Sequence, residues 1–93
     1  MPEKMTDADR DALIANGWAH DADRDALTKE FKFKNFATAF GWMTQMAIEA
    51  EKLNHHPEWF NVYSRVTVTL TTHDTNGLSE LDGKLAANMD QSA

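Results

Sequence analysis

The 93-residue sequence contains no cysteine, which excludes disulfide bonds, thiolate metal ligands and a cysteine nucleophile. Glycine is also scarce, at 4 residues, and none of them forms a glycine-rich phosphate-binding loop. No apolar run approaches the roughly 18 residues that would span a bilayer, and residues 1–10 are too polar for a signal peptide. From these absences we expect a cytoplasmic protein.

Positive charge is also limited, with 9 Lys and Arg against 15 Asp and Glu, a formal net charge of −6. Contacts to phosphate need clustered Lys and Arg, so this balance disfavours direct binding to nucleic acid or to an anionic membrane surface. The length is that of one domain, expected over residues 1–93. A chain this short has a thin core, and therefore we expect it to oligomerise.

Periodicity and capping residues predict seven elements in the order α-β-β-α-β-β-α. Helices are expected over about 7–16, 35–54 and 79–90, and strands over about 18–20, 26–34, 60–63 and 65–72. Val66, Val68 and Leu70 alternate with threonines, which is typical of a strand with one buried face. We expect an α+β fold with a four-stranded antiparallel sheet and helices packed on one face.

The long helix carries two neighbouring apolar stripes. The first consists of Phe36, Phe40, Met43, Ala47 and Ala50, and the second of Ala39, Trp42, Met46 and Leu53. A helix that lies on a sheet needs only one stripe for packing. We therefore expect the residues around Phe40, Met43 and Ala47 to contact another subunit.

The stretch from Glu51 to Trp59 carries the strongest chemical signal. Pro57 disfavours helical geometry at His56, so two adjacent imidazoles are expected at the C-terminus of the long helix. That helix end has partial negative charge, which favours the imidazolium form and suits a proton donor. Glu51 lies one helical turn before His55 and is expected to orient its ring.

Two alternatives to catalysis stay open for these histidines. A histidine near a helix C-terminus is often only a cap, and a zinc site from His55, His56 and His73 is the main rival. The spacing is unlike that of known zinc sites and does not favour metal binding. Trp18 can stack on a flat heterocycle, although core packing is favoured, and residues 20–25 are expected to form a solvated loop.

These residues complete a family signature: an acid, three residues, His-His-Pro, five residues, an aromatic residue, nine residues, His, and eight or more residues before Asp. The matching positions are Glu51, His55-His56-Pro57, Tyr63, His73 and Asp82. On this signature, and on segments such as Gly17-Trp18 and Glu58-Trp59-Phe60-Asn61, the chain resembles the pterin-4a-carbinolamine dehydratases. The resemblance covers about residues 6–91.

The resemblance implies a lyase that dehydrates 4a-hydroxytetrahydropterin to quinonoid dihydropterin and water. This reaction recycles the pterin cofactor of aromatic amino-acid hydroxylases, and no metal or organic cofactor is expected. His55 and His73 would be the acids that serve the two hydroxyl faces, and His56 would chiefly bind and orient the pterin.

The resemblance also implies supporting residues and an assembly. Glu51 would position the histidines, Trp18 would contact the pterin ring, and Pro57 belongs to the signature. Asp82 would support the site, or it would only complete a capping box with Ser79. Family members commonly form dimers of dimers, so a homodimer or homotetramer is expected. The alternative function is a non-catalytic interaction module that acts as a dimerisation cofactor of a transcription factor.

Overall fold

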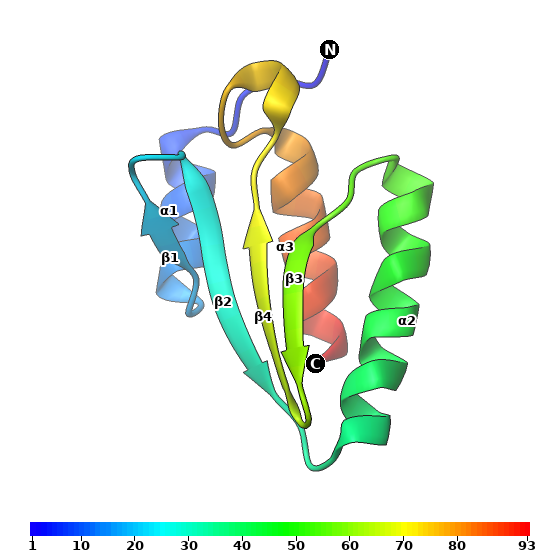
Figure 1. Cartoon of the computed structure of the whole chain (residues 1–93). Coiled ribbons are helices and arrows are strands. Elements are labelled where there is room, and N and C mark those ends of the chain that lie inside the picture. The colour runs from blue at the N-terminus through cyan, green and yellow to red at the C-terminus, as the bar shows by residue number, and fades with distance from the viewer.

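Three α-helices and a four-stranded antiparallel sheet make up the fold in a computed structural model that describes residues 1–93 (Figure 1). The elements are α1 (Asp7–Ala15), β1 (Ala19–Asp21), β2 (Ala26–Lys32), α2 (Phe36–Leu53), β3 (Glu58–Val62), β4 (Arg65–Leu70) and α3 (Glu80–Ser92). A short 3-10 turn, η1 (His73–Thr75), lies between β4 and α3. The predicted order of helices and strands and the α+β class are confirmed.

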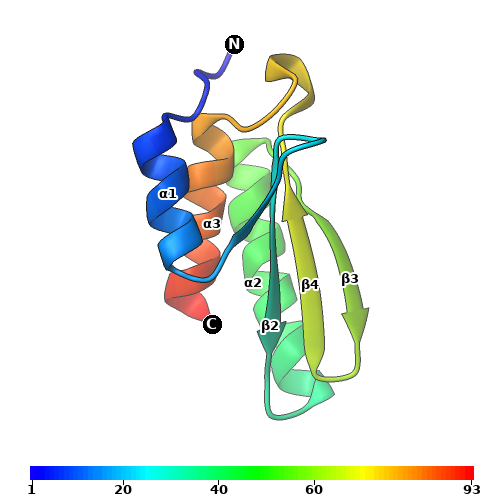
Figure 2. The same cartoon turned by 90° about the vertical axis from the view of Figure 1, so that its left-hand side faces the viewer.

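The sheet has the strand order β1-β2-β4-β3, with all neighbours antiparallel. The central pair, β2 and β4, runs in register from Leu27 opposite Leu70 to Lys32 opposite Arg65. All three α-helices lie on one side of the sheet (Figure 2). The other side carries the threonine row of β4, where Thr67 and Thr69 are half-buried.

The core lies between the sheet and the helices. In β4 the alternating residues Val66, Val68 and Leu70 are buried, as the period of two predicts, and they pack with Leu27 and Phe31 of β2. Large residues of the helices, such as Trp42, Leu85 and Met89, complete this cluster from the other side. The core fixes the sheet against α2 and α3, whose ends carry the signature residues.

Two asparagines set the ends of α2. The Asn35 side chain accepts a hydrogen bond from the Thr38 N–H at 2.8 Å, and Asn54 ends the helix in the left-handed conformation at φ 50°. The buried stripe of α2 consists of Ala39, Trp42, Met46 and Ala50.

The other apolar stripe predicted on α2 is divided between the core and the surface. Ala50 is buried and Met43 packs against the core. Phe36 is 47% exposed and Phe40 is 54% exposed, and the two rings contact each other with centroids 5.7 Å apart. Within a single chain, Phe36 and Phe40 are the part of this stripe that stays uncovered. No helix combines the length with the apolar composition that a bilayer span requires.

Candidate active site

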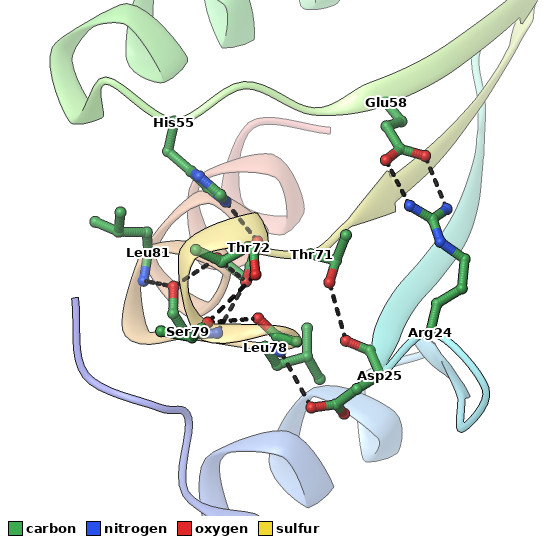
Figure 3. Close-up of polar contacts among 12 residues, drawn as sticks. Arg24, Asp25, His55, Glu58, Thr71, Thr72, Leu78, Ser79 and Leu81 are labelled. Carbon is green, nitrogen blue, oxygen red and sulfur yellow. Dashed lines mark hydrogen bonds and ion pairs between the residues drawn. The ribbon is translucent and has the colours of Figure 1, made fainter. Parts of the chain in front are cut away.

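The candidate site lies where α2 ends, β4 ends and α3 begins. His55 follows the cap residue Asn54, and its side chain points toward the start of α3 (Figure 3). There, His55 Nε2 lies 2.5 Å from Asp82 Oδ1, and the His55 side chain is only 11% exposed. The imidazole is therefore held by a carboxylate on one nitrogen, which leaves Nδ1 for another partner.

The Asp82 carboxylate is fully buried and connects three segments. Its Oδ2 accepts a hydrogen bond from the Ser79 N–H at 2.9 Å, which completes the capping box of α3, and another from Thr72 Oγ1 at 2.6 Å. Its Oδ1 faces His55. The structure thus gives Asp82 the structural role of the capping box and, at the same time, a contact with a signature histidine.

Glu51 contacts His56 rather than His55. Its Oε2 is hydrogen-bonded to His56 Nε2, so the predicted pairing of Glu51 with His55 is wrong. The helical spacing of four residues places two side chains on one face only while the helix continues, but α2 ends at Leu53 and Asn54 reverses the backbone. Both Glu51 and His56 are exposed, so this pair is open to solvent or to a ligand.

His73 is exposed and starts the turn η1, directly after the buried Thr72 that contacts Asp82. It borders an open hollow of about 300 Å³ that no hydrophobic residue lines. The hollow is lined by Asp23, Arg24, Thr71, Thr72, His73, Asn76 and Gly77. Asp82 therefore links the two histidines: it contacts His55 directly, and it contacts Thr72, the residue before His73.

Two further residues of the predicted site differ in where they lie. Pro57 is half-buried and directly follows His56 in the connection between α2 and β3, whereas Trp18 lies elsewhere. Trp18 is 2% exposed, and its Nε1 donates to Asp90 Oδ2 at 2.9 Å. Asp90 is eight residues along α3 from Asp82, which corresponds to roughly 12 Å. This buried position does not offer the contact with a pterin ring that the resemblance implies, and it corresponds to core packing.

The turn between β1 and β2 contributes residues that the sequence did not identify. Arg24 forms a bidentate ion pair with Glu58, in which Nη1 donates to Oε1 at 2.9 Å and Nη2 donates to Oε2 at 2.7 Å. These hydrogen bonds raise the pKa of Arg24 and lower the pKa of Glu58. His20 Nε2 lies 2.7 Å from Asp25 Oδ1, and this hydrogen bond lowers the pKa of Asp25.

Residues 21–24 are exposed, as the sequence predicts, but the turn is also attached to the rest of the fold through Arg24 and Asp25. Arg24 ties it to the first residue of β3, directly after the His-His-Pro segment. The only signal in the sequence is one arginine within a run of acids, and such a signal does not identify a partner 34 residues away.

No three His, Asp or Glu side chains lie close enough together to hold a metal ion. The three signature histidines do not form a ligand set of that kind. The arrangement instead contains two imidazoles, His55 and His56, that each share a hydrogen bond with a carboxylate, and a third, exposed imidazole, His73, that follows the Thr72 contact to Asp82 in the chain. Imidazoles are the side chains most often used as general acids and bases.

A family model described as pterin 4 alpha carbinolamine dehydratase matches residues 3–92. A relative from Sinorhizobium fredii, provisionally named as a pterin-4-alpha-carbinolamine dehydratase, is 64% identical, with 99% of this chain and 90% of the relative covered. The crystal structure of a transcriptional coactivator/pterin dehydratase from Brucella melitensis matches with a TM-score of 0.88 and 49% identity, covering 98% of this chain and 99% of the other.

A second solved structure is a pterin dehydratase-like protein identified as a RuBisCO assembly factor in the alpha-carboxysome. It matches with a TM-score of 0.71 and 26% identity over 83% of this chain and 89% of its own. The same fold is thus found in a protein with a different described role.

Proposed function

The chain belongs to the pterin-4-alpha-carbinolamine dehydratase family, and from this premise we propose that it dehydrates 4a-hydroxytetrahydropterin to quinonoid dihydropterin. The observation that carries the proposal is the buried contact between His55 and Asp82. Asp82 also accepts a hydrogen bond from Thr72, the residue directly before His73. The physiological role would be to recycle the pterin cofactor of an aromatic amino-acid hydroxylase.

The reaction is an elimination of water across the C4a–N5 bond. One proton is delivered to the 4a oxygen, and the C4a–O bond breaks so that water leaves. The proton on N5 is lost to a base, and the electron pair on nitrogen forms the new C4a=N5 double bond. One acid and one base suffice for this reaction, and each contributes about 10²- to 10⁴-fold to the rate.

His55 suits the acid role because its ring is held in place. The buried carboxylate of Asp82 accepts from Nε2 and fixes the orientation of the ring. Nδ1 is then the nitrogen that donates to the leaving hydroxyl. His73, exposed at the border of the polar hollow, would serve the opposite hydroxyl face.

His56 would bind the pterin rather than deliver the proton. It is exposed, and Glu51 accepts from its Nε2, so its Nδ1 is available to a polar edge of the ligand. Glu51 would therefore position His56. Pro57 would help to orient both histidines by restricting the backbone around them.

The direct test supplies freshly generated 4a-hydroxytetrahydropterin and follows the absorbance of the quinonoid product. Turnover by the purified chain should exceed the buffer rate, and the double variant H55A/H73A should lose nearly all activity while its circular dichroism spectrum is unchanged. Asn88→Ala, a change at a half-buried position of α3 away from the histidines, is the matched control. Wild-type turnover equal to the blank would end the proposal.

A second candidate function, a protein-interaction module, is favoured by the exposed stripe of α2. Phe36 and Phe40 are each about half exposed on this helix and contact each other, and large apolar residues grouped in this way mark interaction surfaces. The same surface would serve a homodimer or homotetramer. Light scattering of the protein alone and with a candidate partner helix separates the two, since an interaction module would exchange its own subunits for the partner.

A further inference from the structure

The segment that carries His73 is a closed loop whose shape is fixed by its own backbone. Thr72 and Gly77 exchange two hydrogen bonds, from the Thr72 N–H to the Gly77 oxygen at 3.0 Å and from the Gly77 N–H to the Thr72 oxygen at 3.1 Å. These bonds determine the conformation of residues 72–77. They do not determine how the loop is oriented relative to the sheet and to His55.

That orientation depends on contacts made outside the closed loop. On one side, Thr72 Oγ1 donates to Asp82 of α3. On the other side, Asp25 of the β1–β2 turn contacts both residues that flank the loop. The Asp25 backbone oxygen accepts from Thr71 Oγ1 at 3.1 Å, and Asp25 Oδ2 accepts from the Leu78 N–H at 3.2 Å (Figure 3).

The fit between Asp25 and the loop is close. Gly77 packs against the carboxylate so tightly that a Cβ added at Gly77 would lie 2.3 Å from Asp25 Oδ2. Asp25 itself has a left-handed backbone at φ 49°, and its Oδ1 is hydrogen-bonded to His20. Asp25 therefore has a restricted backbone conformation, and from this conformation its backbone oxygen and its carboxylate accept hydrogen bonds from the two residues that flank the loop.

We propose that Asp25 is a positioning residue for His73: by holding Thr71 and Leu78, it sets the place of the loop that carries this histidine. The inference rests on the proposed function, in which His73 transfers a proton to the substrate. Asp25 acts without touching the substrate. Its effect arises because proton transfer depends steeply on the placement of the donor.

The variant that isolates the side chain is Asp25→Gly, because glycine keeps the left-handed backbone without strain and removes the carboxylate. Asp25→Asn is the conservative variant, since its amide oxygen can still accept from the Leu78 N–H and asparagine tolerates φ above zero. Asp21→Asn is the matched control at the last residue of β1, because the Asp21 side chain bonds only locally, to the Asp23 N–H at 3.1 Å.

We expect D25G to lower kcat by about tenfold to a hundredfold with little change in KM, whereas D25N and D21N stay close to wild type. The loss should depend on His73. In an H73A background the D25G change should therefore cause little further loss of kcat, because residues that act through one group are not additive.

A second readout does not require activity. Hydrogen exchange measured by NMR should show a faster-exchanging Leu78 amide in D25G, while the Thr72 and Gly77 amides keep their protection because the loop stays closed. The ring resonances of His73 should shift in D25G and return toward wild type in D25N.

Three results would overturn the inference: an equal loss of kcat from D25G with and without His73, an unchanged kcat in D25G despite faster Leu78 exchange, or an unshifted His73 ring. If the wild-type chain shows no dehydratase turnover, the proposed function fails and the NMR readout alone decides the positioning role. If D25G does not fold, Thr71→Val removes the Thr71 hydroxyl contact to the Asp25 oxygen and should cause a smaller loss of kcat, again only when His73 is present.

Discussion

Replacing Asp82 by alanine should destabilise the protein more than the loss of a surface carboxylate does. The carboxylate is fully buried, and three groups are hydrogen-bonded to it: the Ser79 N–H, the Thr72 hydroxyl and His55 Nε2. Removing it takes away one half of the capping box of α3 and leaves buried donors without an acceptor.

The magnitude follows from what each donor can do afterwards. The Ser79 N–H loses its half of the capping box, and a buried donor without a partner costs about 1–3 kcal/mol. The Thr72 hydroxyl keeps Ser79 Oγ at 2.7 Å, and His55 is 11% exposed and can reach water, so these two groups together add only about 1 kcal/mol. The total is about 2–4 kcal/mol, a large part of the roughly 5–15 kcal/mol that holds a domain folded.

Urea unfolding followed by far-UV circular dichroism measures this loss. The matched control is Asp9→Ala, because Asp9 occupies the same third position of its helix, three residues after the cap Thr6, but is exposed. It should cost less than about 1 kcal/mol. The reasoning would be refuted if D82A cost no more than D9A. D82N, which keeps one oxygen acceptor but no charge beside His55, should retain more stability than D82A and still lose activity.

Two other predictions concern acid and assembly. The pKa values of Asp25 and Glu58 are lowered in the folded state by His20 and Arg24, so their stabilising contribution is complete above the unfolded values near pH 4 and is lost as the pH falls through the folded values. The urea midpoint should therefore drop between about pH 5 and pH 3, and it should drop less in E58Q; equal drops would contradict this. Phe40→Lys should reduce the mass measured by light scattering to that of one chain, whereas Gln45→Lys, also exposed on α2, should not; the same mass for both variants would exclude this stripe as the interface.

Local signals in the sequence predicted most of the fold. The two asparagines that bound α2 and the period of two in β4 each act through neighbouring residues, so a pattern in the sequence suffices to find them. The capping box of α3 is equally local, since Ser79 and Asp82 are three residues apart.

Contacts between distant segments could not be predicted in the same way. Whether Glu51 contacts His55 or His56 depends on the exact residue at which α2 ends, because the backbone reverses there. The sequence does not predict helix ends to within one residue. The contacts of Arg24 and Asp25 join an exposed turn to residues more than thirty positions away, and only the register of the sheet brings them together. A single sequence contains no pattern that encodes such a register.

The attachment of α1 has a consequence for how the molecule unfolds. None of its residues is buried, and the segment is joined to α3 by polar contacts at its two ends: the Glu80 N–H with the Glu3 oxygen at 2.9 Å, and Asn16 with Asp90 at 2.9 Å. Separating it from the body uncovers Leu13 and Met5, which are only partly buried against the core, so its local opening has a smaller free energy than the melting of β2 and β4 with their fully buried side chains. The chain thus consists of a cooperative body and a weakly held N-terminal flank, and a single melting curve would average over the two.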